Sequence, residues 1–290
     1  MRTEKEMMDL ILNFAHRDER IRVVGMEGSR TNVNVPKDRF QDYDITFVVT
    51  EMESFLKEDG WLDYFGKRII MQKPEAMELF PPEFGNWFSY LMLFEDGNRI
   101  DLTLVPLAEL DLYLQSDKLL TVLLDKDARV PQIPVPTDVD YHVKQPSAQM
   151  FDDCCNEFWW VSTYVAKGLC RREMLFSVEH LNSYVRPMLL KMLAWRVGIN
   201  TDFSFSVGKS YKYLDKYLEP DIWDQLLQTY PKGTYDAVWE ALFVCHKLFR
   251  QTAKYVADQL GFTYPDYDEK VSKYIQSLRA ETGDGSLSTP

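Results

Sequence analysis

The chain contains few of the residues that build disulfide frameworks and zinc sites. Among its 290 residues there are 4 cysteines and 4 histidines. The cysteines form no Cys-x-x-Cys pair and stand at no zinc-ligand spacing from a histidine. This argues against a zinc site and against a disulfide scaffold. We expect reduced, partly buried thiols, as is usual in a cytosolic protein, at Cys154, Cys155, Cys170 and Cys245.

Long apolar runs are also missing. A membrane-spanning helix needs roughly 18 or more consecutive apolar residues, and no segment of the sequence reaches that length. Residues 1–6, Met-Arg-Thr-Glu-Lys-Glu, lack the apolar region of a secretory signal. We therefore expect a soluble, cytoplasmic protein without a membrane partner.

Positive charge is scarce relative to negative charge. The chain has 33 Lys and Arg against 45 Asp and Glu, a formal charge of −12. Binding to a nucleic-acid backbone needs cations that displace counterions, so this balance argues against a nucleic-acid partner. It favours a cationic partner through long-range attraction, although an acidic surface can also serve solubility alone. With 46% hydrophobic residues, the chain is globular and long enough for two domains.

The most informative stretch is Gly28-Ser29-Arg30, followed by Asp42-Tyr43-Asp44. Residues alternate faces along a strand, so Asp42 and Asp44 point to the same side. Two neighbouring like charges repel unless a cation lies between them, and carboxylates suit Mg²⁺. A glycine and a serine let the backbone approach a phosphate closely. The pattern indicates a Mg²⁺-dependent enzyme that acts on a nucleotide, the alternative being a solvated strand face beside an ordinary turn.

A third acid strengthens this interpretation. In Arg99–Val105 the apolar residues occupy one face of a predicted strand, and Asp101 occupies the other. The preceding Glu95-Asp96-Gly97-Asn98 is typical of a hairpin turn after a strand at Trp87–Phe94. A lone acid on a strand with an apolar opposite face needs a partner or a function.

The first half of the chain predicts a small α/β unit with a mixed sheet. A capping box at Thr3–Glu6 begins a helix that ends near His16. Two further helices are expected at Glu53–Phe65 and from Pro106 to Leu114, and Leu119–Asp125 is ambiguous between strand and helix end. The expected strands are Ile21–Met26, Tyr43–Thr50, Arg68–Gln72, Trp87–Phe94 and Arg99–Val105.

The second half predicts helices. Val130–Pro146 contains four prolines and is expected to be an extended linker. Pro187 should kink or divide one helix, and Gly168, Gly198 and Gly261 stand where C-terminal caps are expected. The expected helices are Ser147–Gly168, Arg171–Gly198, Pro220–Tyr230 and Thr234–Gly261. The predicted domains are 1–135 and 136–280, followed by a loose tail at 281–290.

These segments together resemble the aminoglycoside 6-adenylyltransferases, which modify streptomycin and belong to the nucleotidyltransferase superfamily. The resemblance runs over nearly the whole chain and is carried by Met26–Asn32, Gln41–Ile45, Arg99–Thr103, Asp153–Trp159 and Tyr164–Leu169. It implies an α+β N-terminal nucleotidyltransferase domain with a mixed sheet, followed by an all-α C-terminal domain that binds substrate. The implied reaction transfers AMP from ATP to the 6-hydroxyl of streptomycin and releases pyrophosphate.

The resemblance also implies roles for individual residues. Asp42, Asp44 and Asp101 would be catalytic and would hold two Mg²⁺ ions, as in other two-metal sites. Asp101, or a glutamate of the helical half, would take the acceptor proton. Gly28, Ser29 and Arg30 would bind the phosphates, although Arg30 could instead pair with a nearby acid. Lys209 and Lys212 are candidates to meet the triphosphate or are simply solvated; Val207–Ser210 is not a P-loop, because the motif's first glycine is missing.

Candidate acceptor-binding residues are acidic and aromatic. Such groups suit a guanidinium-bearing sugar through charge-assisted hydrogen bonds and cation–π stacking. Tryptophans more often fill a core than bind a ligand, so both roles remain open for Trp159. The candidates are Asp153, Glu157, Trp159, Glu83 and Glu179.

Two rival functions remain at this point. One is a nucleotidyltransferase that acts on a protein hydroxyl or an RNA end, and the acidic charge weighs against RNA. The other is a nucleotidyltransferase fold that only binds a ligand or partner. The presence of all three acids weighs against the second rival. The range of aminoglycosides accepted and the oligomeric state are not set by the sequence.

Overall fold

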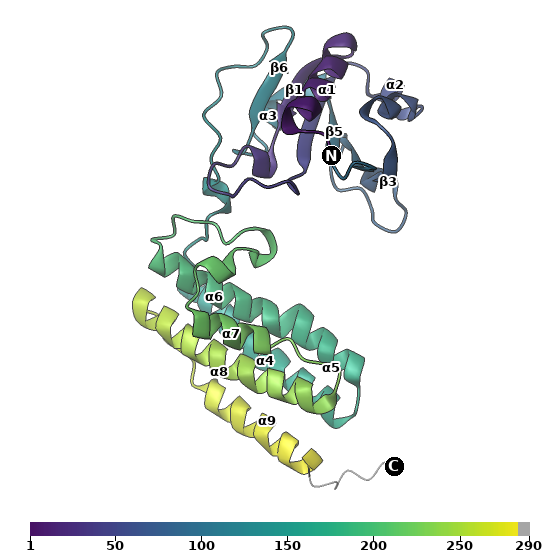
Figure 1. The fold of residues 1–290 in the computed structure, drawn as a ribbon. Helices are drawn as coiled ribbons and strands as arrows, with labels where there is room; N and C mark the ends of the chain where they lie inside the picture. The colour runs from purple at the N-terminus through teal and green to yellow at the C-terminus, as the bar shows by residue number, and fades with distance from the viewer. Residues whose placement is uncertain (284–290) are drawn as a thin grey trace. The chain divides into compact units, whose positions relative to one another are not determined.

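The computed structural model describes residues 1–283 and divides into two compact units. The first unit comprises Met1–Asp140, and the second begins at Tyr141. In Figure 1 the first unit carries the sheet, and the second contains helices α4 to α9. The predicted fold class, a mixed-sheet α+β domain followed by an all-α domain, is confirmed.

The first unit is built on one six-stranded sheet with the order β3-β4-β5-β2-β1-β6. The central pair β2 and β5 is parallel, and the other neighbouring pairs are antiparallel. The sheet is therefore mixed, as the sequence predicted. Its strands are β1 (Ile21–Met26), β2 (Tyr43–Val49), β3 (Arg68–Gln72), β4 (Phe88–Phe94), β5 (Arg99–Pro106) and β6 (Thr121–Asp125).

The two faces of this sheet have different partners. Tyr43, Ile45 and Phe47 of β2 join a core with α1 (Glu4–Arg17) and the segment Gly60–Phe65. On the other face, Val48 packs with Leu110 and Tyr113 of α3 (Leu110–Leu114). Because strand residues alternate sides, Asp44 and Asp101 lie on the face that α3 covers.

Two predicted helices of this unit are shorter than expected. The helix predicted at Glu53–Phe65 is divided into α2 (Met52–Leu56) and a 3₁₀ segment at Gly60–Phe65. The break falls at residues 57–59, directly before Gly60, and a glycine weakens a continuous helix through its conformational freedom. The helix expected from Pro106 begins as 3₁₀ turns at Leu107–Glu109 before α3. The ambiguous Leu119–Asp125 forms β6, on the sheet edge.

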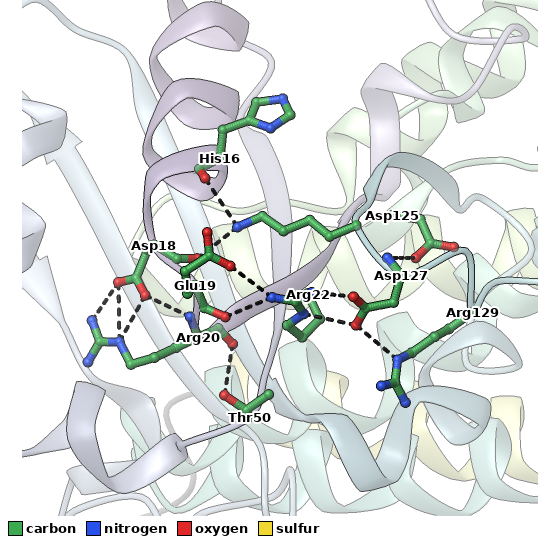
Figure 2. Close-up of polar contacts among 10 residues, drawn as sticks. His16, Asp18, Glu19, Arg20, Arg22, Thr50, Asp125, Asp127 and Arg129 are labelled. Atoms are coloured by element: carbon green, nitrogen blue, oxygen red, sulfur yellow. Dashed lines mark hydrogen bonds and ion pairs between the residues drawn. The ribbon is translucent and has the colours of Figure 1, made fainter.

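A polar network ties together the end of α1, the start of β1 and the end of β6 (Figure 2). Arg22 pairs with both Glu19 and Asp127, and Lys126 donates to the main-chain carbonyls of His16 and Asp18. These contacts lie where β1 begins, whereas the Gly-Ser turn follows the end of β1. The network therefore anchors the strand at the end opposite the candidate site.

The second unit is helical and has its own core. The core is formed by residues such as Phe158, Leu189 and Phe249. All four cysteines are free thiols, and three of them are buried, as expected. The helices are α4 (Ala148–Cys170), α5 (Met174–His180), a π turn (Leu181–Val185), α6 (Arg186–Asn200), α7 (Pro220–Gln228), α8 (Tyr235–Leu260) and α9 (Tyr267–Gly283).

The predicted caps were wrong at two glycines and right at one. Gly168 and Gly198 lie inside α4 and α6, where closely packed neighbours leave no room for a side chain. A Cβ on Gly168 would lie 2.4 Å from Ser177 Oγ, and one on Gly198 would lie 2.5 Å from the Phe203 ring. Gly261 ends α8 in the left-handed conformation at φ 70°, as predicted. Pro187 divides the helix as expected, since the π turn stands directly before α6.

The predicted tail begins too early. Helix α9, which the sequence pattern did not reveal, continues through Gly283, so the prediction of a loose tail is wrong at 281–283. Residues 284–290 of that tail lie outside the described residues. Tertiary contacts stabilise α9: Ile275 is buried, and Arg250 of α8 binds the Asp268 carboxylate. Within residues 1–283, no helix combines the length and apolar character needed to cross a bilayer.

The proline-rich segment is divided between the two units. Its first part contacts the sheet unit, where the Thr137 N–H donates to the carbonyl of Lys118 and Lys118 pairs with Asp140. The sequence placed the domain boundary at 135/136, and the compact units divide after Asp140. The interaction of buried Asp138 with two asparagines, described below, gives this segment a further anchor.

Candidate active site

The Gly-Ser turn and Asp44 are packed directly against each other. Gly28 begins a 3₁₀ turn with φ +73°, and a Cβ at this position would lie 2.2 Å from Asp44 Oδ2. The Glu27 N–H donates to the Asp44 carbonyl over 3.0 Å. Only glycine allows both this backbone conformation and this approach. The turn predicted to cradle phosphate therefore lies against one of the predicted metal ligands.

Asp44 and Asp101 are register partners on the adjacent parallel strands β2 and β5. Burial raises the pKa of Asp44 to about 6, and the negative charges of Asp101 and Asp42 add to this shift. A carboxylate with a raised pKa beside two like charges is electrostatically unfavourable unless a cation compensates it. The structure thus gathers the three predicted acids at the start of two central strands.

Arg99 is a counter-ion for two of these acids, Asp101 and Asp42. Its Nε and one terminal nitrogen donate to both oxygens of Asp101 at 2.7 and 2.6 Å, and Nη1 lies 3.5 Å from Asp42 Oδ2. The Arg99 side chain is 41% exposed. Its position is therefore set mainly by the contacts with Asp101 and Asp42 rather than by packing against neighbours. Among residues 1–283, no group of three or more Asp, Glu, His or Cys side chains has the arrangement of a preformed metal site.

Arg30 has a structural role that the sequence did not reveal. Its guanidinium donates to the carbonyls of Asp42 and Gln41 and stacks 3.6 Å from the centre of the Tyr43 ring. The side chain is only 9% exposed and lies 3.5 Å from Glu4. Arg30 thereby fixes the main chain that leads into β2, and so positions Asp42 and Asp44.

The residues after the turn are anchored by side-chain hydrogen bonds. Thr31 donates to the carbonyl of Leu119 over 2.8 Å, and Asn34 donates to Asp138 over 2.9 Å. Asn32 and Asp138 are both buried and also interact. The Gln41 side chain donates to the Ser29 carbonyl over 3.0 Å. The turn is consequently held from both sides while Ser29 remains partly exposed.

Glu27 is a partly buried acid beside the site, and the sequence suggested no role for it. Tyr113 of α3 donates a short hydrogen bond to the Glu27 carboxyl, and its hydroxyl occupies the space left by the missing side chain of Gly25. Burial raises the pKa of Glu27 to about 7, although the hydrogen bonds from Tyr113 and Thr46 oppose the shift. The feature of the sequence that could have indicated a role for Glu27 is its position directly before the Gly-Ser turn.

The two candidate lysines lie in an irregular loop of the helical unit. Lys209 and Lys212 are exposed at the ends of a short 3₁₀ turn, and Lys212 Nζ lies 5.1 Å from the Tyr213 ring centre. Gly208 has φ 75°, and Ser210 and Tyr211 have positive φ despite carrying side chains. Such conformations cost free energy and persist only where the surrounding structure enforces them.

On α4 the structure separates the predicted acceptor residues into surface and core. Asp153 is exposed and accepts a hydrogen bond from Gln149 over 2.8 Å, and Glu157 is partly exposed. Trp159 is 1% exposed and packs in the core of the helical unit. Its neighbour Trp160, which belongs to the same acidic and aromatic stretch but was not among the predicted binding residues, is 59% exposed. A surface ligand of this unit can therefore reach Trp160 and cannot reach Trp159.

The remaining two candidates lie on different units. Glu83 is exposed in the irregular segment before β4, in the sheet unit. Glu179 is exposed on α5 and accepts a hydrogen bond from Ser183 over 2.7 Å. Glu83 thus shares the sheet unit with the three predicted acids, and Glu179 belongs to the helical unit.

A mixed sheet that presents a Gly-Ser turn against paired strand acids, joined to a helical unit, defines a nucleotidyltransferase-type protein. Residues 1–278 match the family model described as streptomycin adenylyltransferase. Since the match spans nearly the whole chain, the protein belongs to the streptomycin adenylyltransferase family. The predicted family and the prediction of an adenylyltransferase enzyme are confirmed.

Two sequence relatives agree with this assignment, and one solved structure serves for comparison only. An aminoglycoside 6-adenylyltransferase of Bacillus subtilis (strain 168) is 55% identical over 279 residues, covering 96% of this chain and 98% of that protein. One of Campylobacter jejuni is 55% identical over 284 residues, covering 98% of each. A crystal structure of an aminoglycoside 6-adenyltransferase from Bacillus subtilis shows 50% identity, covers 96% of this chain and 99% of that chain, and has a TM-score of 0.48.

Proposed function

We propose that this protein transfers AMP from ATP to the 6-hydroxyl of streptomycin, with Mg²⁺, and releases pyrophosphate. The observation that supports this most is the pairing of Asp44 with Asp101 beside the Gly28 turn. The names of the relatives, aminoglycoside 6-adenylyltransferases, support the choice of acceptor. A product modified in this way would no longer be the active antibiotic.

The three acids fit divalent cations. Carboxylate oxygens are the ligands that Mg²⁺ prefers. The pKa of Asp44 is raised first by burial and then by the negative charges of Asp101 and Asp42, which Arg99 only partly offsets. Asp42, Asp44 and Asp101 would hold two ions. When bound, Mg²⁺ would supply positive charge that neutralises phosphate and lowers the pKa of the acceptor hydroxyl. Arg99 now pairs with Asp101 through a half-exposed side chain, which leaves it free to turn away into solvent.

The chain's own groups bind and orient the substrates. The backbone N–H groups of the Gly28 turn and the Ser29 hydroxyl hold the phosphates that leave as pyrophosphate. Arg30 keeps Asp42 and Asp44 in place through the preceding carbonyls. The Asp101 carboxylate accepts the proton of the acceptor hydroxyl. Most of the rate gain then comes from positioning and from charge neutralisation.

The helical unit supplies charges of both signs. Asp153 and Glu157 on α4, together with the exposed Trp160, bind the cationic acceptor through ion pairs and cation–π contact. Glu179 and Glu83 are further acids for the guanidinium or amino groups of the acceptor. Lys209 and Lys212 bind phosphate, and the enforced backbone conformation of their loop supports a binding role.

A product assay tests this function. The full-length chain is incubated with ATP and MgCl₂, and pyrophosphate release is followed with streptomycin, streptomycin blocked at its 6-hydroxyl, other aminoglycosides, a hydroxyl-bearing protein and an RNA end. We expect release with streptomycin and none with the blocked compound. Mass spectrometry should locate AMP on the 6-hydroxyl. The proposal would be refuted if pyrophosphate were released only with the protein or the RNA, or if none of the acceptors supported release.

A further inference from the structure

Glu27 and Tyr113 form a pair that none of the proposed binding or catalytic roles uses. Glu27 stands between the end of β1 and Gly28, where the Gly-Ser turn begins. Tyr113 lies on α3, on the side of the sheet that carries Asp44, and its hydroxyl donates a short hydrogen bond to the Glu27 carboxyl. An acid so close to the proposed phosphate site repels phosphate unless its carboxyl is held away from the turn.

The Tyr113 hydroxyl occupies a notch that Gly25 leaves in β1. A Cβ on Gly25 would lie 1.7 Å from the hydroxyl oxygen and 2.7 Å from the ring carbon that bears it. Glu27 has an extended backbone and follows Gly25 by two residues, so both face the same side of the sheet. The hydrogen bond therefore draws the Glu27 carboxyl back along β1 toward Gly25, away from the turn.

Tyr113 is itself held by several contacts. Its side chain is 2% exposed, and the Trp87 ring meets its ring edge-on with centres 6.2 Å apart. Trp87 Nε1 in turn donates to Glu109, directly before α3, over 2.7 Å. Thr46 of β2 also hydrogen-bonds to the Glu27 carboxyl. A side chain fixed in this way by packing and hydrogen bonds can hold its partner in one geometry.

The main chain of Glu27 connects this pair to the candidate active site. Its N–H donates to the Asp44 carbonyl over 3.0 Å, and its carbonyl carbon is bonded to the Gly28 nitrogen. With the N–H fixed on Asp44 and the carboxyl fixed on Tyr113, Glu27 has little freedom to rotate. The direction of the first N–H groups of the turn is thereby set, and N–H groups that are oriented in advance bind anions best.

We infer that the Tyr113 hydroxyl positions the phosphate-binding turn, by holding the Glu27 carboxyl back toward Gly25 so that the N–H groups of the Gly28 turn stay directed at the phosphates of ATP. The inference rests on the proposed use of this turn for ATP. It adds Tyr113 and Glu27 to the proposed machinery as positioning residues, neither of which needs to touch a substrate.

Conservative substitutions separate this role from packing alone. Tyr113→Phe removes the hydroxyl and keeps the ring that packs on Trp87. Glu27→Gln keeps a side-chain oxygen that accepts from Tyr113, whereas Glu27→Ala removes it. A packing role predicts a lower melting temperature and no difference between the two Glu27 variants in phosphate binding. A positioning role predicts that phosphate binding follows the hydrogen bond.

Direct binding measurements on the full-length chain test the inference. The dissociation constants of ATP and of inorganic tripolyphosphate are measured by calorimetry with MgCl₂ and without acceptor, beside the melting temperature. The control is Tyr90→Phe, which removes a buried hydroxyl from the opposite face of the sheet, where it donates to the Phe55 carbonyl over 3.4 Å. We expect Tyr113→Phe to bind both ligands about tenfold more weakly, since one hydrogen bond to a carboxyl is lost. Tyr90→Phe should bind both as the wild type does.

The Glu27 variants and kinetics complete the test. Glu27→Ala should weaken both ligands as Tyr113→Phe does, and Glu27→Gln should restore most of the binding. The double variant Tyr113→Phe/Glu27→Ala should be no weaker than Glu27→Ala alone, because both changes remove the same hydrogen bond. In steady-state assays the KM for ATP should rise in Tyr113→Phe, and the KM for the acceptor should stay unchanged.

Four results would overturn the inference: unchanged binding in Tyr113→Phe, weaker binding of ATP without weaker binding of tripolyphosphate, equal losses in the two Glu27 variants, or additive losses in the double variant. Each is distinguishable from failure of the proposed function, which is read from the wild-type product alone. Tripolyphosphate binding that depends on the Tyr113 hydroxyl would support the inference even if streptomycin were not the acceptor.

Discussion

Gly28 and Asp44 share one small volume: the position of a Cβ on Gly28 is 2.2 Å from Asp44 Oδ2. The turn that is proposed to hold phosphate and the strand acid that is proposed to hold metal are therefore built as a unit. The same carboxylate faces Asp101 on the neighbouring strand. Any change at Gly28 must act on Asp44, and this coupling makes the site testable by small substitutions.

Gly28→Ala should reduce adenylyl transfer by at least about tenfold, a loss of roughly 1.4 kcal/mol in transition-state stabilisation. The added methyl group must displace the Asp44 carboxylate, and alanine is also strained at φ +73°. The measurement is kcat/KM for ATP alongside the melting temperature. Gly233→Ala is the matched control, because a Cβ there meets nothing within 4 Å. Equal kinetics of the two variants would contradict the coupling.

Asp42→Asn and Asp44→Asn should each abolish transfer while the fold remains intact, since the change removes charge and keeps shape. For Asp44→Asn we also expect metal-free stability to be equal or higher, because its partly buried carboxylate lies beside the like charges of Asp101 and Asp42. Activity and thermal melting with and without MgCl₂ are the two readouts. The control is Asp258→Asn, on the exposed side of α8.

Retention of more than about a tenth of the wild-type rate in either site variant would show that these acids do not hold the catalytic metals. A Mg²⁺-dependent rise in melting temperature in the wild type that is lost in Asp44→Asn would support the assignment independently of activity. Asp258→Asn should keep both the rate and the metal response.

The parts of this fold that the sequence revealed are those with strong local signals. Alternation along Arg99–Val105 placed Asp101 on the correct face of β5, and the capping box at Thr3–Glu6 begins α1 as predicted. Local patterns could not show that Gly168 serves packing rather than helix ending, because the contact is with Phe176 and Ser177 on another helix. The burial of Trp159 and the exposure of Trp160 likewise depend on which face of α4 the core covers.

Interactions between distant residues were also beyond the sequence interpretation. The sequence left Arg30 open between a phosphate ligand and a partner of a nearby acid. The structure pairs it with Glu4, and only the folded chain shows its guanidinium on the Gln41 and Asp42 carbonyls. Glu27 gave no local pattern at all, since its partner Tyr113 follows much later in the sequence. Helix α9 has a weakly amphipathic sequence and is held by the Arg250–Asp268 contact.

Stability should depend on pH through His246. Burial lowers the pKa of His246 to about 3, Arg250 lowers it further, and Asp268 opposes the shift. The unfolded chain takes up this proton near its usual pKa of about 6.5, and the folded chain does not. Stability from this group is therefore complete above about pH 6.5 and is lost as the pH falls, by about 1.4 kcal/mol per pH unit at most.

The measurement is the free energy of unfolding of the wild type and His246→Phe at several pH values between 7 and 5. The ring should be accepted among Phe158, Trp159 and Phe243, and the variant should lose less stability on acidification. His16→Gln, at an exposed position on α1, should keep the wild-type slope. Parallel curves for the wild type and His246→Phe would show that His246 does not govern this pH range.

Binding of the acceptor should depend on Glu157. If Asp153 and Glu157 on α4 bind a guanidinium sugar, Glu157→Gln should raise the acceptor KM far more than the ATP KM. Removing one partner of a desolvated charge pair typically costs about 2–5 kcal/mol, and the partial exposure of Glu157 reduces that cost. Salt should weaken acceptor binding further, since exposed charges are screened beyond roughly 8 Å at physiological ionic strength.

The control for this prediction is Glu240→Gln, on the exposed side of α8, which should behave as the wild type. Unchanged streptomycin kinetics in Glu157→Gln, or a defect confined to ATP, would move the acceptor site away from this end of α4 and make Glu83 and Glu179 the next residues to test.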